Sequence, residues 1–177
     1  MLTVTQRKKY FEYLGLGEYN SENILKVQKK YFVRKRDQDG VYGSDTDKLI
    51  VNLYRVRKYA PHFKITEFKC HCNGKYCTGY PAYISATLLK FLELVRLEFG
   101  VTYITSGLRC KTWNSMQTGS ASKSRHLSGK AVDLNGSYTK TASGRAKVKK
   151  FWYKLKGANF CYYGTTNMGT SVHCDVK

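Results

Sequence analysis

The sequence predicts an α+β protein in which a small helical module precedes an α+β domain with a mainly antiparallel sheet. Three observations support this fold class. The first sixty residues carry helical periodicity, a strongly amphipathic segment follows residue 85, and four short segments rich in β-branched and aromatic residues lie in the second half. With 42% hydrophobic and 24% charged residues among 177, the chain can bury a core and is not disordered as a whole.

Short helices are predicted in the N-terminal part of the chain. Ser21 is suited to cap a helix whose apolar residues repeat on one face. After a polar turn, Ser44 is suited to cap a second helix, and Pro61 ends it. We therefore place a domain boundary here, with a helical module in residues 1–60 and a second domain in residues 61–177.

The second domain mixes helices and strands. Ser85 is suited to cap a core helix that ends at Gly100, and residues 142–156 predict a further helix with a very basic face. The predicted strands are residues 101–106, 130–134, 159–163 and 171–176.

The charge of the chain is strongly unbalanced. The 31 Lys and Arg residues against 12 Asp and Glu give a formal net charge of +19, which attracts a polyanionic partner. Nucleic acid qualifies, and so does a bacterial wall with its carboxylates and teichoic-acid phosphates. Tyrosine beside lysine is also typical of single-strand binding, but we interpret positions such as Tyr103, Tyr162 and Tyr163 as core positions. We therefore expect a wall partner and no specific nucleic acid.

The sequence contains no signal for a membrane. No apolar run approaches the roughly 18 to 20 residues that a spanning helix needs, and the first dozen residues contain no apolar signal-peptide core. We therefore expect no signal peptide, no membrane span and a chain that begins in a cytoplasm. The two-part layout makes a monomer the expected state.

Cys70, Cys72 and Cys77 form a tight cluster with His71. A cytoplasmic origin favours thiols or metal ligands over a disulfide framework. A structural metal, with a more distant cysteine completing four ligands, is one interpretation. Because Cys-x-Cys differs from the Cys-x-x-Cys pairs of standard sites, we expect a packed loop with free or paired thiols and keep structural zinc as the alternative.

Two of the four histidines have neighbours that indicate chemistry. His126 precedes Asp133 by seven residues, and Gly129 between them lets the chain turn into a strand, so that both side chains can converge. His173 lies in the last predicted strand. Two neutral imidazoles and one carboxylate leave the fourth zinc position open for water, which is the pattern of catalytic zinc.

Three motifs carry a family resemblance in their order and spacing. They are Ser-Gly-Leu-Arg at 106–109, the pattern SxHxxGxAxD at 124–133, and a terminal HxD at 173–175. With these motifs, residues 63–177 resemble the D-Ala-D-Ala carboxypeptidase family of zinc peptidases, which includes peptidoglycan endopeptidases and many phage endolysins. The resemblance implies that His126, Asp133 and His173 hold one catalytic zinc ion.

The same resemblance implies roles for neighbouring residues. Arg109 matches an arginine that faces the substrate carbonyl or carboxylate, and Ser124 matches a serine that hydrogen-bonds substrate or site backbone. Many members place a Glu or Asp three residues before the last zinc histidine, where this chain has Thr170. We expect Asp175 to replace it as general base, because residues i and i+2 of a strand share a face. Orientation of a zinc histidine is its alternative role, and Glu67 is a more distant candidate base.

Residues 26–55 resemble the peptidoglycan-binding type 1 repeat. The matching residues are Gln28, Asp39, Gly40, Tyr42, Gly43 and Thr46. The alternative is a three-helix linker or a nucleic-acid-binding module.

Together the two resemblances imply a lytic enzyme. The expected activity is that of a zinc-dependent peptidoglycan peptidase of the phage endolysin type, more an endopeptidase than a carboxypeptidase. Such an enzyme would stay in the cytoplasm of an infected bacterial host until its release to the wall. The alternative function is a catalytically silent protein that binds wall glycopeptide or nucleic acid.

Overall fold

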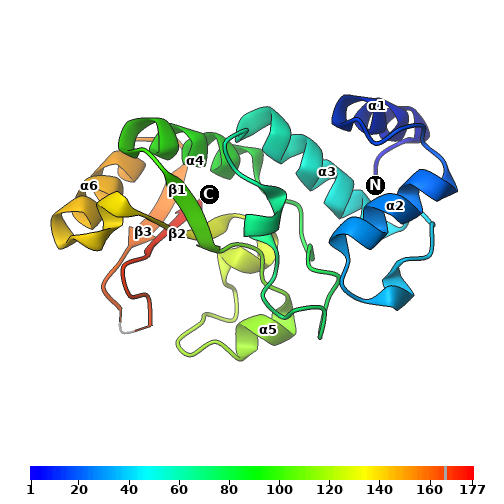
Figure 1. Ribbon diagram of the computed structural model, residues 1–177. Helices are drawn as coiled ribbons and strands as arrows, with labels where there is room; N and C mark the ends of the chain where they lie inside the picture. Colours follow the sequence, from blue (N-terminus) through cyan, green and yellow to red (C-terminus); the bar gives the residue numbers. More distant parts are fainter. Residues whose placement is uncertain (166) are drawn as a thin grey trace.

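The computed structural model describes residues 1–165 and 167–177, and within them the predicted α+β class is confirmed (Figure 1). The helices are α1 (Val4–Leu14), α2 (Ser21–Tyr31), α3 (Ser44–Tyr59), α4 (Ala86–Phe99), α5 (Lys111–Ser115) and α6 (Ala142–Tyr153). The strands are β1 (Thr102–Ser106), β2 (Ala131–Gly136), β3 (Ala158–Tyr162) and β4 (Val172–Val176). No helix in the described part of the chain combines the length and apolar character that a membrane crossing requires.

The helix starts differ from the sequence prediction at two places. Asn20, not Ser21, caps α2, because its side chain accepts a hydrogen bond from an amide of the first turn. Gly43 precedes α3 and has no side chain with which to cap it. The predicted cap at Ser85 is confirmed, since its hydroxyl accepts from an amide at the start of α4.

Gln28 is the centre of a buried network in the N-terminal half. Its amide nitrogen donates to Asp39 Oδ1 at 2.9 Å, to the carbonyl of Val41 at 3.0 Å and to Thr46 Oγ1 at 3.1 Å. Its carbonyl oxygen accepts from the amide of Gly40 at 2.8 Å. Gln28 and Thr46 are almost fully buried, so loss of a partner would leave a polar group without solvent or hydrogen bond. The network therefore fixes α2 against the start of α3.

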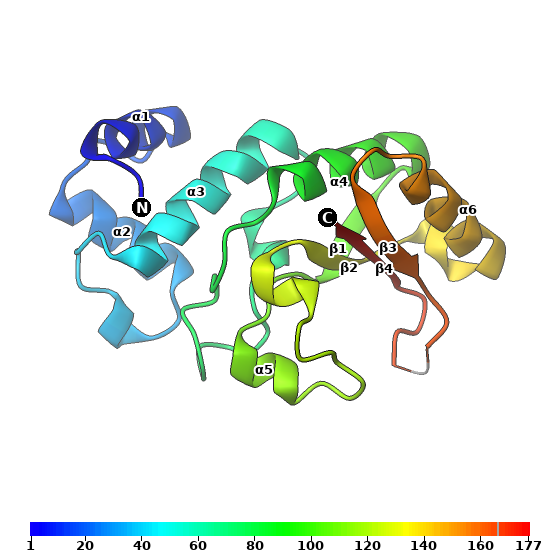
Figure 2. The same ribbon diagram turned by 180° about the vertical axis from the view of Figure 1, so that it is seen from behind.

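Helix α3 connects the two halves of the molecule (Figures 1 and 2). Asn52 donates to the carbonyl of Ala82 at 2.9 Å and accepts from the amide of Ile84 at 2.7 Å. Asp47, also buried, accepts from the hydroxyl of Tyr83 at 2.6 Å. One continuous hydrophobic core runs from the N-terminal helices to the sheet. The division into residues 1–60 and 61–177 thus stays a prediction about folding units.

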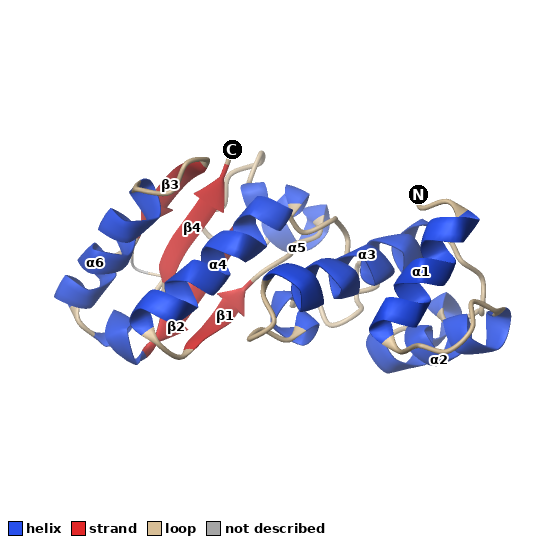
Figure 3. Cartoon of the chain, turned by 90° about the horizontal axis from the view of Figure 1, so that it is seen from above, coloured by secondary structure: helices blue, strands red, loops and turns tan. Residues whose placement is uncertain are grey.

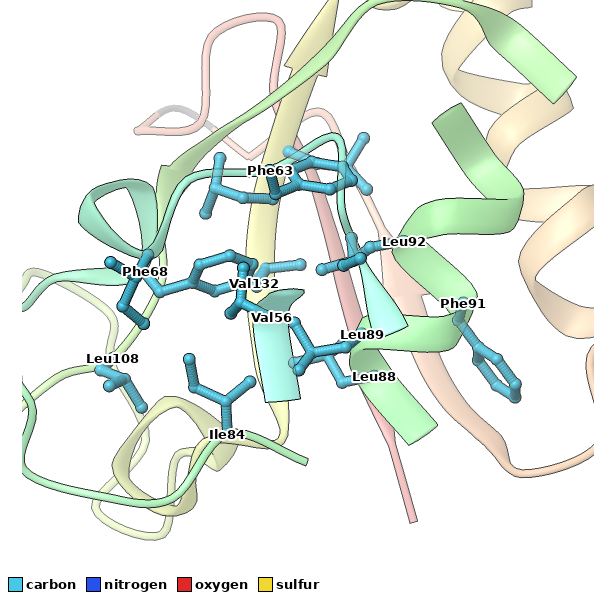
Figure 4. Close-up of a cluster of buried hydrophobic side chains, with 14 of the residues drawn as sticks. Val56, Phe63, Phe68, Ile84, Leu88, Leu89, Phe91, Leu92, Leu108 and Val132 are labelled. Carbon is cyan, nitrogen blue, oxygen red and sulfur yellow. The ribbon is translucent and has the colours of Figure 1, made fainter. Parts of the chain in front are cut away.

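The sheet has the strand order β1-β2-β4-β3, and all three strand pairs are antiparallel. Helices α4 and α6 cover one face of it (Figure 3). Side chains alternate between the two faces of a strand. Figure 4 shows Val132 of β2 in the core with Leu89 and Leu92 of α4, Val56 of α3 and Phe68. The intervening residues of β2 and β4 therefore point to the opposite face.

Gly129 allows the chain to turn from a short 3₁₀ helix, Arg125–Ser128, toward β2. Its φ is +66°, a left-handed conformation that residues with a Cβ rarely adopt. A Cβ at this position would lie 2.2 Å from the carbonyl oxygen of Tyr83. The position therefore requires glycine both for its conformation and for the close approach of another segment.

We predict that Gly129→Ala destabilises the protein more than Gly15→Ala does. Gly15 has nearly the same φ of +67°, but nothing lies within 4 Å of a Cβ there. Each substitution should cost about 1–3 kcal/mol in backbone strain, and only Gly129→Ala must also displace the Tyr83 carbonyl. Thermal unfolding of both variants measures the difference. Equal decreases in melting temperature would contradict the prediction.

Candidate metal centre

One row of residues crosses all four strands on the face away from α4 and α6. Ser106 of β1 lies opposite Asp133 of β2, Asp133 lies opposite His173 of β4, and His173 lies opposite Tyr162 of β3. Directly paired residues of antiparallel strands have Cβ atoms about 4.5–5.5 Å apart. Strand register therefore brings Asp133 and His173 together, although 40 positions separate them in the sequence.

His126 reaches this row from the 3₁₀ helix that precedes β2. Its Nδ1 lies 2.7 Å from the carbonyl oxygen of Gly107. A carbonyl only accepts hydrogen bonds, so Nδ1 carries a proton and Nε2 of the neutral ring presents a lone pair. That Nε2 lies 3.5 Å from Asp133 Oδ1 and 3.3 Å from His173 Nδ1. The predicted three residues thus converge on one point.

The distances between the three facing atoms are close to those between the ligand atoms of a tetrahedral zinc site. His173 Nδ1 lies 2.9 Å from Asp133 Oδ1, which with 3.3 and 3.5 Å completes a triangle. Zinc bonds of about 2.0–2.1 Å at tetrahedral angles require ligand atoms about 3.3–3.4 Å apart. The donor set and spacing therefore fit a zinc ion with three protein ligands.

The pKa shifts of the three residues fit a site for a cation. Burial alone would lower the pKa of His173, but Asp133 and Asp175 at its two ring nitrogens raise it to about 9. Burial would raise the pKa of Asp133, but its hydrogen bonds with the two histidines hold that pKa well below its usual range. Burial lowers the pKa of His126 and keeps its ring neutral. Without a metal, a proton on His173 can balance the negative charge of Asp133, and a divalent cation can replace that proton.

Arg109 is bound to the other oxygen of the metal-site carboxylate. Its Nη2 donates to Asp133 Oδ2 at 2.9 Å, and both its Nε and Nη2 donate to Ser106 Oγ at 3.1 and 3.0 Å. This ion pair is largely shielded from solvent, with each side chain 16% exposed. Arg109 therefore directs Oδ1 of Asp133 toward the histidines. Sequence reasoning predicted a substrate contact for Arg109 and missed this structural role of Ser106.

The expected role of Asp175 as general base stays a prediction, and the contacts of Asp175 also fit its alternative role as the partner that orients a zinc histidine. The strand argument placed Asp175 and His173 on one face, and they do share it. However, Asp175 Oδ2 lies 3.4 Å from His173 Nε2, the nitrogen on the far edge of the ring from the metal triangle. Its Oδ1 accepts from Asn159 Nδ2 and from the amide of Phe160, both at 2.8 Å. Asp175 thus contacts the edge of the His173 ring away from the triangle, where it can orient the ring.

A cleft of about 920 Å³ opens over the metal triangle. Ser124 and Arg109 both lie in its wall, and their substrate contacts stay predictions. Tyr162 stacks on His173 with ring centroids 4.6 Å apart. The prediction that Tyr103 and Tyr162 are core residues was wrong, because they are 49% and 43% exposed. The alternation of side chains along β3 could have indicated the exposure of Tyr162, because its neighbour Cys161 is buried.

The comparison with known families agrees with this geometry. The model of the Peptidase M15 family matches residues 61–175, well over half of the chain. No curated protein and no solved structure matches the sequence. The match includes every residue of the metal triangle. The chain therefore belongs to the peptidase M15 family of zinc metallopeptidases.

Proposed function

We propose that the chain hydrolyses an amide bond in the peptide part of bacterial peptidoglycan, with one zinc ion held by His126, Asp133 and His173. The triangle of facing ligand atoms, with edges of 2.9 to 3.5 Å, carries this proposal. When bound, zinc supplies a Lewis acid that polarises a carbonyl oxygen and acidifies water. One anionic ligand leaves most of the ion's charge available for this purpose.

The residues around the triangle hold and orient it. The Gly107 carbonyl fixes the tautomer of His126, and Asp175 fixes that of His173, so that each ring presents a lone pair. Arg109 uses Nε and Nη2 for Ser106 and Asp133, and its Nη1 has no hydrogen bond within the described residues. We propose that Nη1 donates to a substrate carbonyl or carboxylate, which stabilises developing negative charge.

The cleft suits a peptide that combines apolar and acidic groups. Its wall includes the apolar surfaces of Trp113, Phe160 and Tyr162 and the cationic side chains of Lys123 and Arg125. The stem peptide of peptidoglycan carries alanine methyl groups and free carboxylates. Apolar walls with a few convergent charged groups are typical of sites that orient such a ligand.

We propose a lytic role of the phage endolysin type, with residues 1–60 binding the wall. The Gln28 network supports this assignment, because residues that match the peptidoglycan-binding repeat meet in one place. The net charge of +19 adds attraction to wall carboxylates and teichoic-acid phosphates. A lytic role favours an endopeptidase, since removal of terminal D-Ala leaves the mesh intact.

A catalytically silent wall-binding protein is the second candidate function. Thr170 stands where many family members have a carboxylate, and its hydroxyl accepts from Asn135 at 2.9 Å. The carboxylates that line the cleft within the described residues are Asp133 and Asp175, and both are engaged by other side chains. This alternative predicts wall binding without the release of new amino groups.

We predict that the protein releases amino groups from purified peptidoglycan and that a chelator stops this release. His126→Ala removes one metal ligand, so the rate should fall by more than the roughly 10–100-fold that loss of an outer partner costs. His62→Ala is the matched control, because His62 is exposed and pairs with Glu93. Mass spectrometry of the soluble fragments identifies the bond. Equal release with and without chelator would exclude a metallopeptidase, and no release would support the binding protein.

We predict that Asp175→Ala weakens zinc binding by about 10–100-fold, because it removes the partner that orients His173. A general base would instead leave zinc affinity unchanged while lowering the rate. Competition with a chromophoric chelator measures the affinity. Asn159→Ala, which removes one donor to Asp175 but keeps the carboxylate, should have a smaller effect. Wild-type zinc affinity in Asp175→Ala, together with a lowered rate, would support the general-base role instead.

A further inference from the structure

A second group of metal-ligating side chains lies outside the zinc triangle. Cys70, Cys72 and Cys77 come from the segment before α4, and Cys110 comes from the residue that precedes α5. Their four Sγ atoms all lie within 4.8 Å of one another. We call this group the thiolate cluster. Cys110 is the distant fourth cysteine that the short Cys-x-Cys segment lacked.

The spacing of the thiolate cluster corresponds to a closed tetrahedral zinc site. Zinc–sulfur bonds of about 2.3 Å place the four sulfurs about 3.8 Å apart. Cys72 and Cys77 have Sγ atoms 3.4 Å apart, and no pair exceeds 4.8 Å. Residues 73 and 74 both have positive φ, of 54° and 81°, and they turn the chain so that Cys77 returns to the two earlier cysteines. This turn brings all three sulfurs of the segment together.

Backbone amides point at the sulfur atoms. The amide of Cys110 donates to Cys70 Sγ at 3.3 Å, and the amide of Gly79 donates to Cys77 Sγ at 3.4 Å. The amide of Trp113 donates to Cys110 Sγ at 3.4 Å. Such donors stabilise negative charge on sulfur, which favours thiolates over disulfide sulfurs.

Positively charged residues near the thiolate cluster also favour thiolates. Four thiolates with one zinc ion carry a net charge of about −2. Lys69, Lys75 and Lys111 are close neighbours of the cluster in sequence, and Lys69 packs against Gly79. Cys70, Cys72 and Cys110 are buried, which shields bound metal from water. These surroundings can balance a charged thiolate site.

We propose that Cys70, Cys72, Cys77 and Cys110 hold a structural zinc ion that is separate from the catalytic one. Its four protein ligands leave no position for water, so it supports the fold and takes no part in hydrolysis. It fastens residues 70–77 to Cys110, the neighbour of Arg109. His71 lies between two buried ligands, is itself exposed and lines the cleft. The second metal thus rigidifies one wall of the cleft.

The test counts zinc in the full chain and in His126→Ala, purified without chelator. We expect one zinc ion for each of the two groups in the wild type and one in His126→Ala. X-ray absorption of zinc in His126→Ala should show sulfur ligands alone, at about 2.3 Å. A zinc-free His126→Ala, nitrogen or oxygen ligands in it, or disulfides among the four cysteines in its intact mass would overturn the proposal.

Cys110→Ser provides an independent arm with a matched control. It should lose the sulfur-bound zinc to a chelator at least about tenfold more readily than the wild type, whereas Cys161→Ser should match the wild type. Cys161 is also buried, but its Sγ lies 3.3 Å from that of Cys174, and neither residue belongs to the thiolate cluster. If Cys110→Ser does not fold, the absorption spectrum of His126→Ala still decides. Failure here leaves the wild-type hydrolysis assay unaffected, so the catalytic and structural proposals fail separately.

Discussion

The pairing of β2 with β4 is the constraint on which the metal centre depends. It sets Asp133 directly opposite His173, on the face of the sheet away from the helices. A shift of one residue would turn every side chain of one strand to the other face. His173 and Asp175 would then enter the core, and Val172 and Cys174 would enter the cleft. The buried faces of both strands hold the register, because they pack under α4 and α6.

Burial makes the candidate metal centre well suited to a cation. His126 is 2% exposed, and the Gly107 carbonyl and Asp175 take the outward nitrogens of the two imidazoles. The inward nitrogens then face the Asp133 carboxylate at short range, in surroundings that screen charge poorly. Lone pairs placed together in this way repel unless a positive charge lies among them. In the absence of a metal, the raised pKa of His173 allows a proton to supply this positive charge. A zinc ion between the three residues would supply it instead.

Local patterns predicted the elements well and the long-range contacts less well. Alternation and capping located the four strands and α4, because each depends on neighbouring residues. The convergence of His126, Asp133 and His173 could be predicted because their motifs retain order and spacing. The position of Asp175 could not, since strand periodicity fixes its face but not which edge of His173 it meets. The exposure of Tyr162 could not be predicted either, because it depends on the place of β3 at the edge of the sheet. The contact of Cys70 with Cys110 could not be predicted because 40 positions separate the two residues.

Residues 106–110 couple these parts, because contacts from this short segment reach the metal triangle, the thiolate cluster and the core backbone. Ser106 accepts a hydrogen bond from Arg109, the Gly107 carbonyl holds His126, Arg109 holds Asp133, and Cys110 belongs to the thiolate cluster.

The segment also packs closely against the backbone of Phe68, because the amide of Leu108 donates to the carbonyl of Phe68 at 2.9 Å. A Cβ at residue 107 would lie 2.6 Å from the Cα of Phe68. Only glycine therefore permits this approach. The Ser-Gly-Leu-Arg motif therefore requires glycine for a steric reason. The close packing of Gly107 against Phe68 positions the Gly107 carbonyl, and this carbonyl orients His126.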